Sequence, residues 1–148
     1  MIMQKKLRKR MPILKNVVFD SFALLSFIFD EADAEIVADY FKKALQNKKH
    51  IYICAVNWSE VMYRTIRAQG KGAWKMVQTH LHDFPFEIID ADLALSESAA
   101  EFKANYKMSL ADAYAAALTK AKKAELVTGD PEFKPLEEVL KNIIWLKQ

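Results

Sequence analysis

The sequence contains one cysteine, Cys54, and only three glycines among its 148 residues. A single cysteine excludes an internal disulfide framework, and its place in the apolar run 51–54 is typical of a small buried side chain in a reducing compartment. The glycines are Gly70, Gly72 and Gly129. They leave no glycine-rich loop after the first predicted strand, which argues against a nucleotide-binding fold that cradles phosphates.

Long apolar runs and clustered histidines are missing as well. No stretch approaches the roughly 20 apolar residues that a membrane span needs. Hydrophobic residues nevertheless make up 52% of the chain, so we expect a soluble, cytoplasmic protein with a well-formed core. His50, His80 and His82 do not have the spacing of zinc ligands. No Asp-x-Asp motif follows the first strand and no nucleophile elbow is present, which disfavours haloacid-type phosphotransferases and serine hydrolases.

Positive charge is concentrated at the start of the chain. Residues 1–10 hold five basic residues and no acidic one, so the formal net charge of +3 leaves 3 − 5 = −2 for the remainder. Such a tail can bind phosphates, but we interpret residues 1–12 as a basic, disordered extension. Residues 13–148 then form one compact domain.

Short β-rich segments alternate with longer helical patterns. Apolar runs predict strands at 16–19, 51–55, 86–89, 126–128 and 143–146. Helical spacing predicts helices at 34–46, 57–67, 73–82, 93–106 and 110–123, with a helical turn or two within 131–141. This alternation indicates an α/β fold, in which a mainly parallel five-stranded sheet lies between two layers of helices. Sites in such sheets form beyond the carboxyl ends of the strands.

Four acidic residues stand where this rule predicts a site: Asp20, Glu60, Asp112 and Asp130. Each one has a structural explanation when taken alone. Asp20 and Asp130 suit helix N-caps, and Pro131 suits the first helical position. Ser109 with Asp112, and Asn57 with Glu60, have the spacing of capping boxes.

Taken together, the four carboxylates favour a different interpretation. Clustered, partly buried carboxylates repel one another and cost several kcal/mol unless a cation neutralises them. Oxygen ligands suit a hard divalent cation, and helix N-termini at the same place add positive dipole ends. The pattern therefore predicts a Mg²⁺ or Mn²⁺ site at one edge of the sheet.

The segments around these acids resemble the PIN domain, and specifically the VapC-type toxins. The matching segments are VVFDSFALL (17–25), AVNWSEV (55–61), SLADAYAAA (109–117) and LVTGDPEF (126–133), of which the last two are the most specific. The resemblance extends from Ile13 to Leu146 and implies a three-layer α/β/α PIN-like domain. It implies that Asp20, Glu60, Asp112 and Asp130 are the metal-binding quartet, supported by the Thr128 hydroxyl. Phe22 departs from the pattern, because members often carry a small polar residue there, and we expect its ring to alter substrate contacts or site hydration.

The resemblance also implies an activity. It implies an endoribonuclease, a hydrolase dependent on Mg²⁺ or Mn²⁺, that acts as the toxin of a type II toxin–antitoxin system. One or two ions would polarise the phosphate and activate water, leaving a 5′-phosphate and a 3′-hydroxyl. The implied partners are an RNA substrate, a cognate VapB-type antitoxin and a second copy of the chain. The alternative is a non-catalytic PIN-like module that binds RNA or protein.

Basic residues near the acids are candidates for substrate binding. Arg64, Arg67 and Lys71 follow Glu60 at spacings of four, seven and eleven, so a continuous helix would place them on its Glu60 face. There they would bind phosphate or antitoxin carboxylates. The alternative is an intrahelical Glu60–Arg64 pair worth about 0.3–0.5 kcal/mol, with the other charges solvated. For Trp58 and Tyr63 we favour packing in the core or at a dimer interface over stacking on bases.

Overall fold

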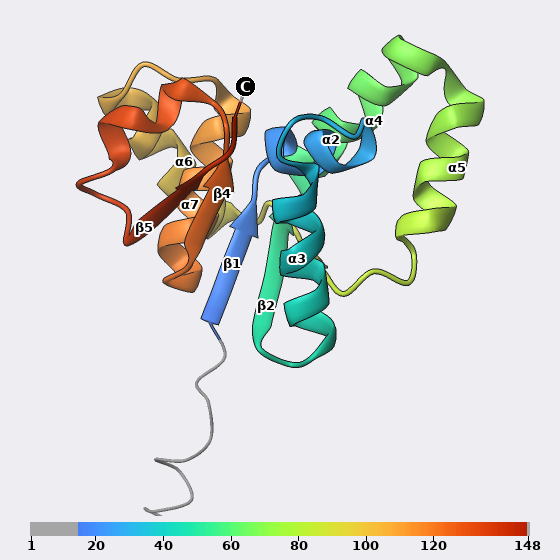
Figure 1. The fold of residues 1–148 in the computed structure, drawn as a ribbon. Helices are drawn as coiled ribbons and strands as arrows, with labels where there is room; N and C mark the ends of the chain where they lie inside the picture. Colours follow the sequence, from blue (N-terminus) through green and yellow to red (C-terminus); the bar gives the residue numbers. More distant parts are fainter. Residues whose placement is uncertain (1–14, 148) are drawn as a thin grey trace, which may run out of the picture.

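The computed structural model describes residues 15–147, and the predicted basic extension lies outside this range. Its centre is a five-stranded sheet with the order β3-β2-β1-β4-β5, and every neighbouring pair of strands is parallel. The strands are β1 (Lys15–Phe19), β2 (Lys49–Cys54), β3 (Glu87–Ile89), β4 (Glu125–Thr128) and β5 (Asn142–Trp145). The predicted five-stranded sheet is therefore confirmed, and it is wholly parallel. Figure 1 shows β2, β1, β4 and β5 side by side.

Helices connect the strands, as expected for parallel pairing. They are α2 (Ser21–Ile28), α3 (Ala34–Leu45), α4 (Ala55–Gln69), α5 (Lys71–Leu81), α6 (Leu93–Asn105), α7 (Leu110–Lys122) and the 3₁₀ helix η1 (Pro131–Leu136). Gly70 separates α4 from α5 at a φ of 90°, in a region that glycine adopts far more readily than other residues. The chain therefore turns sharply at this point, and α4 and α5 are two helices rather than one.

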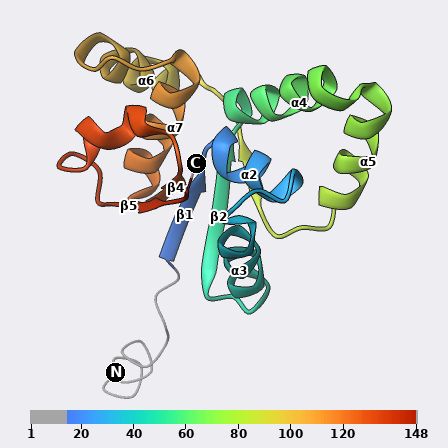
Figure 2. The ribbon, with the colours of Figure 1, turned by 45° about the horizontal axis from the view of Figure 1, so that its top comes forward.

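Alternating side chains of the central strands serve two separate cores. Val17 and Phe19 pack with apolar residues of α2, α3, α4 and α5 on one face of the sheet. Val18 packs on the other face with residues of α6 and α7. Figures 1 and 2 show these two groups of helices on opposite sides of the strands. The three-layer α/β/α arrangement predicted from the sequence is confirmed.

The helix α7 is buried along most of its length because its inward face is built of small residues. Ala113, Ala115, Ala116 and Ala117 are each 0% exposed.

On the other face of the sheet, Trp58 packs against Trp74 with ring centroids 5.2 Å apart, so the packing interpretation of Trp58 is confirmed. Cys54 is buried and unpaired, as the sequence predicts.

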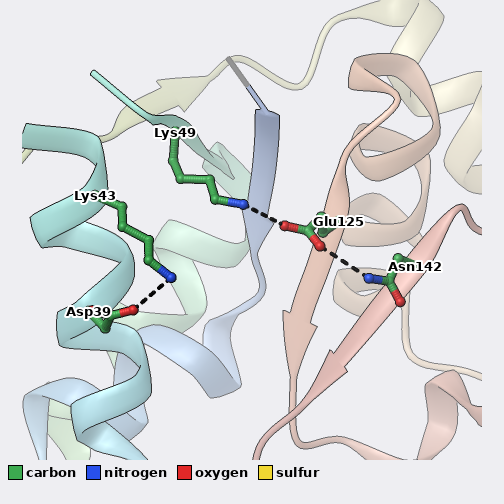
Figure 3. A network of polar contacts seen from close by, with 5 residues as sticks. All are labelled: Asp39, Lys43, Lys49, Glu125 and Asn142. Carbon is green, nitrogen blue, oxygen red and sulfur yellow. Dashed lines mark hydrogen bonds and ion pairs between the residues drawn. The ribbon is translucent and has the colours of Figure 1, made fainter. Parts of the chain in front are cut away.

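A polar network joins three strands at the amino-terminal end of the sheet (Figure 3). Lys49 Nζ at the start of β2 lies 3.1 Å from Glu125 Oε1 at the start of β4. Asn142 Nδ2 of β5 donates to the other oxygen of Glu125 at 3.1 Å. Because parallel strands begin at the same edge, this network lies at the end of the sheet opposite to the carboxyl ends.

One local prediction is wrong. The spacing of Asn57 and Glu60 suggested a capping box, but α4 begins at Ala55 and its N-cap is Cys54. Asn57 therefore lies within the first turn, fully buried, and its Nδ2 donates to the carbonyl oxygen of Ala111 at 3.1 Å. Within residues 15–147, no helix has the length and hydropathy needed to cross a membrane.

Candidate metal centre

The order of the strands fixes where a site can form. From β1 the chain runs outward to β2 and β3, then returns to pair β4 with the other edge of β1 and adds β5. The strand order therefore reverses between β1 and β4, and a crevice forms at the carboxyl ends of strands at such a reversal. Phe19 lies beside Val127 in the register. Asp20 and Thr128 consequently meet at this crevice, and Asp130 follows two residues later.

Asp20 is 1% exposed and is held by two hydrogen bonds. Its Oδ1 accepts from the amide of Ala23 at 2.9 Å, which makes Asp20 the N-cap of α2. Its Oδ2 accepts from the hydroxyl of Thr128. Thr128 in turn accepts from the amide of Asp130 at 3.0 Å. The hydroxyl of Thr128 thus connects the two acids that follow β1 and β4.

Glu60 reaches the same crevice from the second turn of α4. Its Oε1 accepts a hydrogen bond from the hydroxyl of Ser21, the residue that directly follows Asp20. Its Oε2 accepts from the hydroxyl of Tyr63 at 3.2 Å. Arg67 lies over the ring of Tyr63, with 4.8 Å between the guanidinium carbon and the ring centroid. Glu60 is therefore fixed to the start of α2 on one side and to its own helix on the other.

Asp112 enters the crevice from the first turn of α7 and is 4% exposed. The hydroxyl of Ser109 caps this helix by accepting from the amide of Asp112 at 3.1 Å. The amide of Ser109 does not complete a capping box with Asp112 and donates to Glu132 Oε2 at 3.0 Å. Carboxylate oxygens of Asp112, Asp130 and Glu132 all lie within 4.8 Å of one another.

Burial and mutual repulsion change the acidity of this group. Burial raises the pKa of Asp20 to about 7, and the charges of Asp130 and Glu60 add to this rise, against the hydrogen bonds from Thr128 and Ala23. Burial also raises the pKa of Asp112, helped by its hydrogen bond to Glu132 and by the charges of Asp130 and Asp20. The hydrogen bond from Asp112 lowers the pKa of Glu132. The acids therefore form one electrostatic unit.

This donor set fits a hard divalent cation. All candidate ligands are carboxylate oxygens, the type that Mg²⁺ and Mn²⁺ prefer. Asp20 and Asp112 are almost fully buried, and their charged forms are costly there without a cation. Asp20 and Asp112 also lie at the N-termini of α2 and α7, where the helix dipoles favour negative charge. The residues present therefore fit a hard divalent metal ion.

Comparison with protein-family models gives a match to the PIN domain over residues 17–139. The chain belongs to the PIN domain family. The matched range contains the four acids and Thr128, together with most of the sheet. Comparison with curated proteins gives no significant match.

Solved structures of toxin–antitoxin proteins share the fold of this PIN domain. VapBC2 from Rickettsia felis, bound to a DNA fragment from its promoter, aligns with a TM-score of 0.68 at 17% identity, covering 90% of this chain and 98% of that chain. A toxin–antitoxin complex from Klebsiella pneumoniae aligns with a TM-score of 0.62 at 20% identity, covering 89% of this chain and 99% of that chain. VapC20 from Mycobacterium tuberculosis, a toxin that cleaves the sarcin–ricin loop, aligns with a TM-score of 0.60 at 14% identity, covering 80% of this chain and 93% of that chain.

In this PIN domain, Asp112 and Asp130 lie with Glu132 in one carboxylate group. Asp20 is connected to Asp130 through Thr128, and Glu60 is connected through Ser21 to the residue that follows Asp20. Sequence reasoning missed two further polar residues there, Ser21 and Glu132. Ser21 follows Asp20 directly, and Glu132 lies two residues after Asp130 in the turn that Asp130 caps. These short spacings could have identified both residues, because a residue within two positions of an N-cap acid lies near the groups that this acid contacts.

Two hollows adjoin the acids of the PIN domain along α4. The first, of about 680 Å³, extends from Asp130 between α2 and α4, and its lining includes Phe22, Leu25, Phe29, Arg64 and Lys147. The second, of about 530 Å³, is lined by Glu60, Tyr63, Arg64, Arg67 and Ala68. Arg64 borders both. Lys71 lies beyond the break at Gly70 and lines neither, so the shared helical face includes only Arg64 and Arg67.

Proposed function

We propose that this PIN domain is a Mg²⁺- or Mn²⁺-dependent endoribonuclease and the toxin of a type II toxin–antitoxin pair. The observation that carries the proposal is the convergence of Asp20, Glu60, Asp112 and Asp130 at the crevice between β1 and β4 in a chain of this family. The nature of the structural neighbours supports it. Two of them are toxin–antitoxin complexes, and one is a toxin that cleaves the sarcin–ricin loop.

Each residue of the crevice has a defined task in this proposal. Asp20 and Asp112 bind the metal ion directly, while Glu60 and Asp130 bind it directly or through water. Thr128 holds Asp20 in position through its hydroxyl. The bound ion supplies Lewis acidity toward the phosphate and lowers the pKa of the attacking water. The overall reaction is hydrolysis of one phosphodiester bond, and it leaves a 5′-phosphate and a 3′-hydroxyl.

Cleavage of RNA by the purified full-length chain tests this proposal. We expect Mn²⁺-dependent cleavage that excess chelator stops, and an Asp112→Asn variant that is inactive because a neutral amide replaces a buried metal ligand. Asp39→Asn is the matched control, since Asp39 is an exposed residue of α3 that pairs with Lys43. Full activity of Asp112→Asn, or cleavage that continues in excess chelator, would contradict the proposal.

A VapB-type antitoxin and a second copy of the chain complete the proposed assembly. The antitoxin would cover the acidic crevice, and Arg64 and Arg67 beside it would bind either RNA phosphates or antitoxin carboxylates. Co-expression with the product of a small adjacent gene should relieve growth inhibition and yield a complex. Sedimentation of the purified chain should give a dimer, and a monomer at micromolar concentration would remove the homodimer from the proposal.

The alternative function is a non-catalytic PIN-like module that binds RNA or protein. Calorimetric titration with Mn²⁺ separates the two functions without an RNA substrate. An intact set of acids that binds no Mn²⁺ would favour the binding module. The burial of Asp20 and Asp112 argues against it, because buried carboxylates with no ligand to bind cost stability.

A further inference from the structure

Phe22 lies against the backbone of the acidic crevice. It is the second residue of α2, half-buried, and its ring faces Gly129, the residue between Thr128 and Asp130. A Cβ atom placed on Gly129 would lie 2.2 Å from Cε1 and 2.5 Å from Cζ of the Phe22 ring. Only glycine allows the ring to lie where it does.

The same ring forms part of the wall of the 680 Å³ hollow that begins at Asp130. The wall is mostly apolar, with Leu25 and Phe29 beside Phe22. The volume of the hollow is within the range of roughly 300–1,000 Å³ that is usual for ligand sites. A partly exposed aromatic ring that adjoins a metal centre offers a flat surface directly next to the reacting group.

Charged residues also line this hollow: the cations Arg64 and Lys147, and the anion Glu31 in addition to Asp130. Arg64 lines it from α4, one turn after Glu60, and also borders the second hollow. The ion pairs found among residues 15–147 join Lys43 to Asp39 and Lys49 to Glu125, so the intrahelical Glu60–Arg64 pair considered from the sequence is absent there. The guanidinium is therefore available for an external anion, and phosphate is the anion that arginine recognises well.

We propose that Phe22 is a stacking platform for the base of one unpaired nucleotide beside the cleaved phosphate, and that Arg64 binds the next phosphate along the strand. The inference rests on the proposed ribonuclease function and narrows its substrate to single-stranded segments, since a base within a duplex has no free face. The covalent connection of each nucleotide to the cleaved phosphate favours a nucleotide over a peptide as the occupant of the hollow. When one phosphate lies at the acids, the neighbouring nucleotides lie in the hollows that adjoin them, and of these two hollows the one that begins at Asp130 has the Phe22 ring in its wall.

The first test measures cleavage with Mn²⁺ of a short single-stranded RNA and of the same RNA with one abasic ribose at each flanking position in turn. In the wild-type protein, loss of one specific base should lower kcat/KM by roughly 10- to 100-fold, the effect of losing one base–aromatic stack. In Phe22→Leu, intact and abasic RNA should be cleaved equally. Phe22→Tyr should restore the difference. Phe84→Leu is the control, because Phe84 is also half-buried but lines a separate hollow beside α3.

The second test needs no cleavage. RNA with 2-aminopurine at the flanking position is titrated with the Asp112→Asn variant, and stacking on Phe22 should quench its fluorescence. Adding Phe22→Leu should abolish this quenching, while the melting temperature stays close to that of Asp112→Asn alone.

The outcomes separate the two proposals. Absence of metal-dependent cleavage alongside Phe22-dependent quenching would refute the ribonuclease and retain the stacking platform. Normal cleavage with the same abasic sensitivity in Phe22→Leu would overturn the platform alone. It would also be overturned if Phe22→Leu cleaved RNA normally but lost binding to an antitoxin, because the hollow would then be a protein site.

Discussion

Thr128 donates its hydroxyl hydrogen to Asp20 and accepts a hydrogen bond from the amide of Asp130 at 3.0 Å. One buried hydroxyl at the end of β4 therefore orients the acid that follows β1 and the backbone that leads to Asp130. These two hydrogen bonds span the point where the strand order reverses. They therefore position the Asp20 carboxylate and the backbone at Asp130, which come from two separate segments of the chain. Thr128 is 0% exposed, which means that water cannot replace its hydroxyl without rearrangement.

Replacing Thr128 by valine removes the hydroxyl and keeps the shape of the side chain. We expect Mn²⁺ affinity to fall about 10- to 100-fold, the usual effect of losing an outer hydrogen bond to a metal ligand. Thr128→Ser retains the hydroxyl and should bind almost normally. Titration calorimetry measures both variants, and equal affinity in Thr128→Val and the wild-type protein would show that Asp20 needs no such support.

Metal binding should depend on pH because the ligands must lose their protons. The pKa of Asp20 is raised to about 7 and that of Asp112 is raised as well. Affinity for Mn²⁺ should therefore increase from pH 6 to pH 8, and binding at pH 6.5 should release protons. Calorimetry in two buffers of different ionisation enthalpy measures the release. A proton count near zero at pH 6.5 would mean that the acids are already ionised.

The metal-free protein should show the opposite dependence in its stability. Asp20 has a higher pKa in the folded chain, about 7, than its ordinary value of 3.8. Its stabilising contribution is therefore complete below the lower value and is lost as the pH rises through the higher one. Thermal unfolding in chelator should shift to lower temperature as the pH rises from about 4 to about 7. The shift should be smaller in Asp20→Asn, and Mn²⁺ should reverse it in the wild-type protein.

The sequence predicts this fold well because two periodicities dominate it. Apolar strands at 16–19 and 126–128, set between helices of clear 3.6-residue spacing, required a parallel sheet, and the acids at the ends of these strands then had to meet. Contacts set by three-dimensional packing were not predictable in this way. Glu132 lies beside Asp112 because its carboxylate accepts a hydrogen bond from the amide of Ser109 at the start of α7, and no spacing along the chain links residues 112 and 132.

The start of α4 shows a second limit. The spacing of Asn57 and Glu60 suggested a helix start at Asn57, yet the helix begins two residues earlier because β2 ends at Cys54 and leads directly into it. Polar residues near a helix start indicate its position only approximately. The buried contact from Asn57 to Ala111 of α7 explains its polarity better than a capping role.

Asn57 should contribute to stability through that contact. Asn57→Ala removes the donor to the Ala111 carbonyl and leaves a small cavity, so we expect a loss of about 1–3 kcal/mol in the free energy of unfolding. Chemical denaturation measures the loss, with Ser59→Ala on the exposed side of α4 as the control. Because Ala111 directly precedes Asp112, Mn²⁺ affinity should also decrease. Unchanged affinity would indicate that the N-terminus of α7 is held by Ser109 and Glu132 alone.

Gly129 offers an independent test of the position of the Phe22 ring. Alanine at 129 would place a Cβ within 3 Å of three atoms of this ring, so the ring must swing away from the crevice. Because the displaced atoms are the far end of a half-buried side chain, stability should fall by only about 1–3 kcal/mol. The sensitivity of cleavage to a missing base should disappear, as in Phe22→Leu.

The double variant Phe22→Leu/Gly129→Ala makes this test decisive. If both changes act through the same ring, their effects on the intact-to-abasic ratio of kcat/KM will not add. Gly72→Ala is the matched control, because a Cβ there meets no atom within 4 Å. An additive effect of the two changes would mean that Gly129 acts on the neighbouring Asp130 instead, and that its small size serves the metal centre rather than the placement of the Phe22 ring.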